Sequence, residues 1–301
     1  MGSDQAKVSE LRGYITDEIF AALNFHKNSW QRKVFWPLFW LPAHLFAQLA
    51  AKVDTDIERF GIPEVARSVL PRFVKDVQVI GAEHIPEEGP LLVASNHPGA
   101  YDSVAILSNL PRNDIKIVVS DVQLFHNLRS LNDHAIYTYT GTHGRMTALR
   151  SMIREIQNGG SVLVFPSGLV DPDPAFLPDA SKELDKWSPS LELVMRKVPE
   201  AKILITIVSG VLSPKCLRSP LVRLAKVEWQ KRKLAEFIQV MQQLVLSRNL
   251  GLIPKITFAK PVTAGDLMAN NTYSSLMDAI IDQARQLLPL HTPSSNFDGQ
   301  S

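Results

Sequence analysis

The stretch Val93-Ala94-Ser95-Asn96-His97-Pro98-Gly99-Ala100-Tyr101-Asp102-Ser103 predicts a buried strand, a turn and the start of a helix in direct succession. The apolar strand ends in Asn96-His97, Pro98-Gly99 forces a turn, and a helix is expected to begin near Asp102. This order puts His97 at the carboxyl end of a strand, which is where open α/β sheets bind ligands.

His97 and Asp102 are five positions apart in this stretch. On a regular helix, five steps of about 100° would leave them about 140° apart, so the turn is needed to bring them together. If it does so, the Asp102 carboxylate accepts a proton from one imidazole nitrogen, and the other nitrogen is a free base. Such a pair could activate a substrate hydroxyl without a serine nucleophile. The spacing alone favours a structural histidine that Asp102 satisfies.

The remainder of the chain after Pro71 alternates short β-branched runs with helical segments. The predicted strands are 77–80, 91–94, 115–119, 135–137, 162–165, 203–208 and 256–258, and the predicted helices are 103–110, 122–131, 145–157, 190–197, 221–246 and 273–288. This alternation predicts an α/β fold with a largely parallel mixed sheet flanked by helices. We expect three parts: an N-terminal helical, membrane-interacting segment (1–70), the α/β domain (71–290) and a flexible tail (291–301).

The N-terminal part has two distinct segments. Residues 5–24 have the apolar spacing of an amphipathic helix. Residues 34–51 contain no Asp, Glu, Lys or Arg, and Trp30, Trp36 and Trp40 cluster at or near their start. Tryptophan favours the membrane interface, and Pro37 and Pro42 interrupt the stretch, so we expect it to lie in the interface rather than to span the bilayer. A helical hairpin packed on the main domain is the alternative, and both can hold at once.

Composition excludes several classes of protein. The 301 residues are 45% hydrophobic and 21% charged, which is enough to form a large core. A net charge of +2 carries no signature of a nucleic-acid binder. Cys216 is the only cysteine, which excludes an intramolecular disulfide and any cysteine-based metal centre and makes a cytoplasm-facing location the default. His126, His134 and His143 match no metal-ligand spacing, and the sequence has neither a GxSxG nor a P-loop motif.

Two charged segments allow more than one interpretation. Between Lys215 and Lys233, seven Lys or Arg residues face a single acid, Glu228, with Trp229 among them. This segment could meet anionic lipid headgroups or an acidic carrier protein, or it could be a solvated helix face. The loop Asp171-Pro172-Asp173-Pro174 is expected to be a stiff, exposed turn, although it could border the site because it directly follows the block that begins at Phe165.

Several blocks of the sequence together resemble the glycerolipid acyltransferases, the group that includes lysophosphatidate acyltransferases. Asn96-His97-Pro98-Gly99-Ala100-Tyr101-Asp102 resembles their NHxxxxD (HX4D) motif, and Val164-Phe165-Pro166-Ser167-Gly168 resembles their FPEG block. The approach 77–90, the arginine-containing block Gly141 to Arg145 and the late strand 255–262 are also similar to that family. The order and spacing agree from Val77 to Leu267, which is far more specific than any single block.

The resemblance implies transfer of a fatty acyl group from acyl-CoA or acyl carrier protein to a hydroxyl of a glycerolipid or lysophospholipid, as in phospholipid biosynthesis. His97 would be the general base and Asp102 would orient it, while Arg145 would face the acceptor phosphate. Phe165, Pro166, Ser167 and Gly168 would contact substrate, and backbone amides near Gly99 or Gly168 could bind the oxyanion. No metal or redox cofactor is implied. The location implied is a peripheral or monotopic one at a cytoplasmic membrane surface.

Ser167 departs from the family pattern because it replaces the acidic residue of the FPEG block. The change removes a negative charge and leaves room beside the expected acceptor, which predicts a different or bulkier acceptor. Two rival functions remain open: a non-catalytic lipid-binding protein on the same fold, and an acyl-thioesterase in which water replaces the acceptor.

Overall fold

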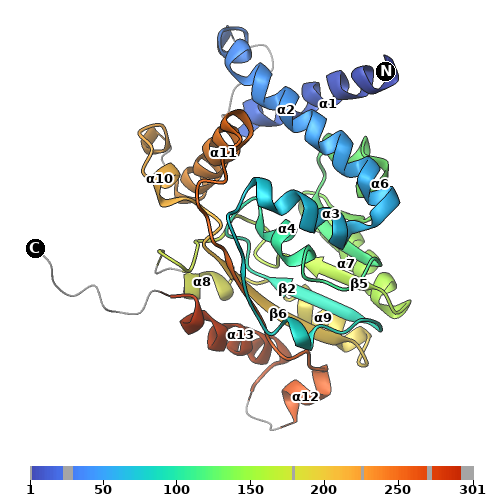
Figure 1. Ribbon diagram of the computed structural model, residues 1–301. Coiled ribbons are helices and arrows are strands. Elements are labelled where there is room, and N and C mark those ends of the chain that lie inside the picture. Colours follow the sequence, from blue (N-terminus) through green and yellow to red (C-terminus); the bar gives the residue numbers. More distant parts are fainter. Residues whose placement is uncertain (1, 23–29, 178–179, 225–226, 270–272, 293–301) are drawn as a thin grey trace, which may run out of the picture.

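One mixed sheet forms the centre of the molecule (Figure 1). The computed structural model describes residues 2–22, 30–177, 180–224, 227–269 and 273–292. Within those ranges, seven strands follow the order β1-β7-β6-β2-β5-β3-β4, and every neighbouring pair is parallel except β6 and β7. The strands are β1 (Gln78–Ile80), β2 (Leu91–Ser95), β3 (Ile115–Ser120), β4 (Ala135–Thr138), β5 (Ser161–Val164), β6 (Lys202–Ser209) and β7 (Lys255–Phe258). The predicted α/β fold with a largely parallel mixed sheet is confirmed.

Helices cover both faces of this sheet, because parallel strands need crossover connections that return along a face. All five residues of β2 are buried as a result. The helices are α1 (Gly2–Ala22), α2 (Trp30–Phe60), α3 (Ile62–Val69), α4 (Asp102–Leu107), α5 (Gln123–His126), α6 (Arg129–Asp133), α7 (Gly141–Gln157), α8 (Ala180–Leu184), α9 (Ser190–Lys197), α10 (Pro214–Leu217), α11 (Glu228–Leu246), α12 (Ala264–Met268) and α13 (Leu276–Leu287), with short 3-10 turns η1 (Leu70–Arg72), η2 (Ala82–His84), η3 (Val222–Leu224) and η4 (Leu288–Leu290). One apolar core lies against α7, α9 and α13, and a second lies against α3 and α4.

The helix predicted over 122–131 is split into α5 and α6 by an extended residue, Leu128. The break exposes the first backbone N–H groups of α6, and the buried carboxylate of Asp54 accepts from Ser130 N at 2.8 Å and Leu131 N at 3.2 Å. Asp54 also pairs with Lys7 at 3.0 Å. One side chain thus joins α1, α2 and α6, which satisfies the orphan donors at a helix start.

Helix α2 runs without interruption from Trp30 to Phe60, with Pro37 and Pro42 inside it. The expectation that the prolines interrupt this segment is therefore wrong. A proline inside a helix costs about 3 kcal/mol, and packing offsets that cost: Phe39, Ala43 and Ala47 share a buried cluster with residues of α1, α5 and α11. The N-terminal segments thus form the packed helical hairpin that the sequence allowed.

The first half of α2 differs from its packed second half. Trp30 is 69% exposed, Val34 60% and Leu38 63%. Among the described helices, α2 alone is long and apolar enough to cross a membrane. Length and composition are the only criteria here, and the core helices of soluble proteins can also meet them. A long apolar helix with an exposed end gives limited support for membrane association.

His291, the first residue of the predicted tail, packs against the sheet. His291 is buried, and its ring nitrogens lie 2.8 Å from Ser209 Oγ and 2.8 Å from Thr257 Oγ1. It therefore ties the C-terminal helix to β6 and β7. Residues 293–301, where the expected tail falls, lie outside the described residues.

Candidate active site

The end of β2 is held in place by the side chain of Asn96. Its Nδ2 donates to Val208 O at 2.9 Å, and its Oδ1 accepts from Val208 N at 2.8 Å. The buried side-chain amide thus continues the β2–β6 ladder by one step beyond the last strand residue. This fixes the chain where His97 leaves the sheet.

The turn brings His97 and Asp102 together as expected. His97 Nδ1 lies 2.8 Å from Asp102 Oδ2, and the Asp102 side chain is fully buried at the start of α4. Nδ1–H donates a hydrogen bond to that carboxylate, and in the neutral form of the ring Nε2 is then the free acceptor. The His97 side chain is 29% exposed, so the ring is not sealed in the interior. Its face stacks on Phe165 with ring centroids 4.5 Å apart.

The acids around His97 set its protonation. Burial lowers the pKa of His97, but the charge and hydrogen bond of Asp102, with weaker contributions from Glu236 and Asp171, override burial and raise the pKa to about 9. The imidazolium is therefore the resting form at neutral pH, and the neutral base becomes the major form only above the raised pKa.

The loop 171–174 is buried, which corrects the expectation of an exposed turn. Asp171 and Asp173 are 3% and 0% exposed. Asp171 Oδ2 accepts from His97 N at 2.9 Å, and Asp171 N donates to His97 O at 2.7 Å. Burial raises the pKa of Asp171, although the N–H of His97 opposes the shift. Asp171 thus holds the backbone of His97, a role that sequence reasoning missed.

Asp173 holds the neighbouring loop in a similar way. Its carboxylate accepts from the backbone N–H groups of Gly210, Val211, Leu212 and Ala175, at 2.9 to 3.3 Å. Burial raises the pKa of Asp173 to about 6 despite these bonds. The two aspartates join the segment after β5 to the ends of β2 and β6. The Asp-Pro repeat is a visible feature of the sequence, but it does not show that the loop is buried.

Glu236 is a second residue that sequence reasoning missed. It lies on α11, far along the chain, and burial raises its pKa to about 7 while the charge of His97 opposes this shift. Asp102 raises the same pKa and Lys233 lowers it. Glu236 therefore belongs to the electrostatic environment of His97.

The FPEG-like block follows β5 directly and lies beside His97. Phe165 provides the stacked ring, and Pro166 is buried with its carbonyl accepting from Ser188 N at 3.1 Å. Ser167 is partly exposed, and its Oγ lies 3.0 Å from Leu169 O. Gly168 is exposed with a φ of +67°, a backbone conformation that favours glycine.

The amides of Gly99 and Gly168 themselves are already hydrogen-bonded, so the expected oxyanion site would need other amides near these glycines and stays a prediction. Gly99 N donates to Asp102 Oδ2 at 3.2 Å, and Gly168 N donates to Phe165 O at 3.1 Å. Each backbone N–H can donate its single proton to one acceptor, and in both glycines that acceptor belongs to the turn itself.

Arg145 lies exposed in the first turns of α7. In the described part of the chain its guanidinium makes no hydrogen bond or ion pair, and no contact joins it to His97 or Asp102. Its five donors are available to an anion, but its assignment to the acceptor phosphate stays a prediction.

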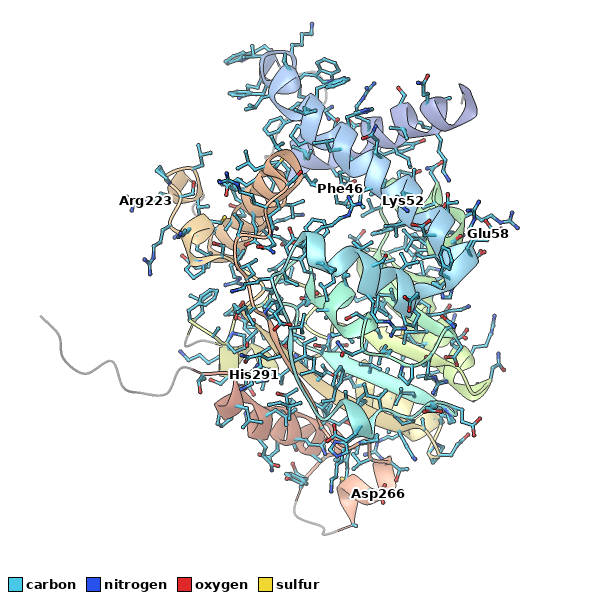
Figure 2. All side chains as sticks on the ribbon, viewed as in Figure 1. Phe46, Lys52, Glu58, Arg223, Asp266 and His291 are labelled. Carbon is cyan, nitrogen blue, oxygen red and sulfur yellow. The ribbon has the colours of Figure 1, made fainter. Side chains whose placement is uncertain are left out.

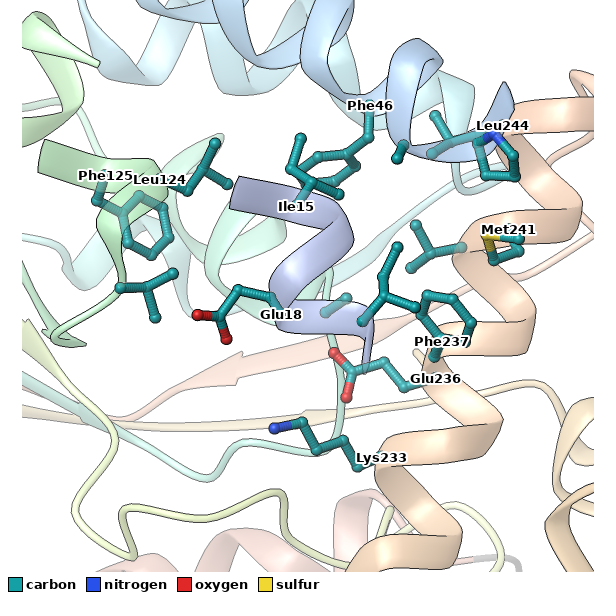
Figure 3. A pocket seen from close by; sticks show the side chains of 16 residues that line it. Ile15, Glu18, Phe46, Leu124, Phe125, Lys233, Glu236, Phe237, Met241 and Leu244 are labelled. Carbon is teal, nitrogen blue, oxygen red and sulfur yellow. The ribbon is translucent and has the colours of Figure 1, made fainter. Parts of the chain in front are cut away.

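An apolar cavity of about 320 Å³ opens beside the turn that follows His97 (Figure 3). Ala100 of the motif lines it, together with residues of α1, α2, α5 and α11 that include Ile15, Phe46, Leu124, Phe237, Val240, Met241 and Leu244. In Figure 3, Glu236 and Lys233 extend from α11 at its border, with Glu18 of α1 nearby. Its size and apolar walls are typical of a small-molecule site.

A known protein family matches the central part of the chain. The family model described as Acyltransferase matches residues 76–197. Over these residues the chain is similar to the acyltransferase family. The matched residues include His97, Asp102, Arg145, the block 165–168 and Asp171, whereas α11 with Glu236 and the N-terminal helices lie outside the match.

No curated protein sequence matches this chain. The 1-acyl-sn-glycerophosphate (LPA) acyltransferase PlsC from Thermotoga maritima is a similar solved structure, with 16% identity and a TM-score of 0.45 over 97% of this chain and 100% of that one.

Proposed function

We propose that this protein transfers a fatty acyl group from acyl-CoA or acyl carrier protein to a hydroxyl of a glycerolipid or lysophospholipid at a membrane surface. The observation that carries the proposal is the 2.8 Å contact between His97 Nδ1 and the buried Asp102 carboxylate, inside the stretch that is similar to the acyltransferase family. The 29% exposure of the His97 side chain supports access of a substrate to the ring.

The proposed step uses only groups of this chain and its two substrates. His97 Nε2 takes the proton of the acceptor hydroxyl while the oxygen attacks the thioester carbonyl. The tetrahedral intermediate then loses the thiolate, which takes a proton from the imidazolium, so that an ester and a free thiol result. Asp102 keeps the proton on Nδ1 and stabilises the imidazolium between the two transfers. The step calls for no metal or redox cofactor.

The acyl chain and the acceptor have separate places in this proposal. The apolar cavity beside Ala100 would take the acyl chain, because its walls are aliphatic and aromatic and it begins three residues from His97. Arg145 would face the acceptor phosphate. The exposed first half of α2 would lie in the membrane interface, with Trp30 and Trp36 at headgroup level, and the cytoplasmic side is the one proposed.

An acyl-transfer assay tests this function. Labelled acyl-CoA and acyl carrier protein are offered with a panel of lysolipids and glycerol 3-phosphate, with and without vesicles, to the parent protein and to His97→Ala. We expect transfer by the parent and a loss of at least about 100-fold in His97→Ala, the scale of a lost general base.

A matched control is available in the same chain. His126 and Asp121 are also five residues apart and also in contact, but on an exposed surface. His126→Ala should therefore keep full activity. Thiol release that needs no added lipid would support a thioesterase instead, and lipid binding without any turnover would support a non-catalytic protein.

A further inference from the structure

Two segments near the carboxyl edge of the sheet contain basic residues but no acidic residue. Residues 201–227 and 237–265 contain no Asp or Glu. Lys215, Arg218, Arg223 and Arg248 within them are exposed, and their side chains make no hydrogen bond or ion pair in the described part of the chain. We call these four residues, together with the exposed Leu221, Val227 and Leu246 among them, the cationic surface. Its charge is therefore not neutralised within the fold.

A polar basin of about 540 Å³ lies between the two segments. Lys215 and Arg248 line it, together with Ser213, Gln242, Ser247 and Asn249. Ser247 and Leu250 adopt φ values of +49° and +55°, the left-handed region that side chains other than glycine rarely adopt. The chain after α11 thus turns tightly around the basin and keeps Arg248 at its rim, an arrangement frequent at ligand-binding loops.

Exposed apolar side chains lie among these cations. Leu221 is 57% exposed, Val227 47% and Leu246 55%. Figure 1 shows α10 and the chain after it as a projection beside α11, and α11 in turn contacts α2. In Figure 2, Arg223 points away from the molecule at the tip of this projection. The cationic surface is therefore continuous with the helices that hold the apolar end of α2.

We infer that the cationic surface docks on a bilayer leaflet containing anionic phospholipid, and that the basin receives a headgroup phosphate between Lys215 and Arg248. An acidic protein would match the charge, but exposed leucine and valine side chains among the cations fit the apolar layer beneath lipid headgroups better. The inference rests on the membrane attachment proposed above and does not depend on the acyl-transfer reaction.

Vesicle sedimentation tests the inference. The full chain is mixed with vesicles of phosphatidylcholine alone and of phosphatidylcholine with phosphatidylglycerol, and a variant with Lys215, Arg218, Arg223 and Arg248 each changed to Gln is compared with the parent. Since each basic residue near an anionic leaflet contributes about fivefold to partitioning, the loss of four should reduce binding to anionic vesicles by about 600-fold. Binding to neutral vesicles, which depends on α2, should not change.

The control variant removes equal charge from another part of the molecule. Lys197, Lys202 and Lys260 lie near the amino end of β6, and Arg150 lies on α7, all four exposed. Changing these to Gln should leave binding to both kinds of vesicle intact, and thermal unfolding monitored by circular dichroism should be the same for both variants.

Three results would overturn the inference. The first is a parent protein that binds neutral and anionic vesicles equally. The second is a control variant that loses as much binding as the test variant. The third is a test variant that binds anionic vesicles like the parent and loses only acyl transfer from acyl carrier protein, which would assign the surface to an acidic protein. Because binding is measured without turnover, failure here is distinct from failure of the proposed reaction.

Discussion

His97 is fixed from two directions by two different carboxylates. Asp102 holds the ring through Nδ1, and Asp171 holds the backbone N–H of the same residue. The ring and the backbone of His97 therefore have little freedom to move. Both acids also favour the imidazolium, so the same contacts that orient the base raise its pKa.

Asp171 can be tested with two substitutions that separate position from charge. Asp171→Ala removes the acceptor of the His97 N–H, and a displacement of the ring should lower kcat by about 10- to 100-fold with little change in KM. Asp171→Asn keeps an acceptor but removes a charge, so it should keep most activity and move the acid limb of the pH–rate profile to lower pH. Steady-state kinetics across pH measures both, with Asp121→Ala as the surface control. Equal effects of the two variants would contradict the assigned role.

Ser167 gives a prediction about acceptor choice. Ser167→Glu restores the acidic side chain of the FPEG block in a partly exposed position, and it should shift preference toward smaller acceptors through charge and bulk. Competition between lysophosphatidate and larger lysolipids measures the shift. If the variant keeps the parent's preference while the parent already turns over an ordinary lysophosphatidate rapidly, the role given to Ser167 is wrong.

The elements of the sheet could be predicted because their signal is local. Each predicted strand is present within about two residues, since a buried parallel strand is a short β-branched run between turn residues. The contact between His97 and Asp102 was predictable for the same reason, as one turn joins them.

The roles of Asp171 and Glu236 could not be predicted, because only the packing of distant elements reveals that a polar loop is buried or that α11 approaches the motif. Likewise, nothing local shows that small residues on α2 pack well enough to keep Pro37 and Pro42 inside a helix.

Helix α11 offers a test of the cavity. Val240 lines the cavity, so Val240→Phe should narrow it and shift the preferred acyl chain to a shorter one, at a stability cost of about 1 to 3 kcal/mol from overpacking. Val245→Phe places the same change on an exposed position of the same helix. Acyl-CoA donors of graded length measure the preference. A parallel fall for all chain lengths in Val240→Phe would argue against the cavity as the acyl site.

At the scale of the whole molecule, the pKa values of His97 and His291 are shifted in opposite directions. Burial, with a smaller effect of Lys255, lowers the pKa of His291 to about 4, whereas the pKa of His97 is raised to about 9. Both imidazoles titrate near 6.5 in the unfolded chain. The contribution of His291 to stability is complete above this value and is lost as the pH falls toward 4, while that of His97 is complete below it and is lost as the pH rises through 9.

The free energy of unfolding should therefore decline on both sides of a maximum near neutral pH. His291→Gln should flatten the decline between pH 6.5 and 4, which amounts to up to about 3 kcal/mol in the parent. Urea unfolding at several pH values measures the slope, and His126→Gln serves as the exposed control. If the acid slope is the same in His291→Gln as in the parent, the buried imidazole does not cause it.

The dependence of kcat/KM on pH is the sharpest test of His97 as the general base, because it reports the ionisation of the free protein's base. We expect acyl transfer by the parent to rise with pH to an inflection near 9. In Asp102→Asn the inflection should move to lower pH and the maximal rate should fall by about 10²- to 10⁴-fold, since the carboxylate no longer orients or stabilises the imidazolium. A parent profile without this inflection, or an Asp102→Asn variant with the parent's profile and rate, would contradict the assignment of His97 as the base.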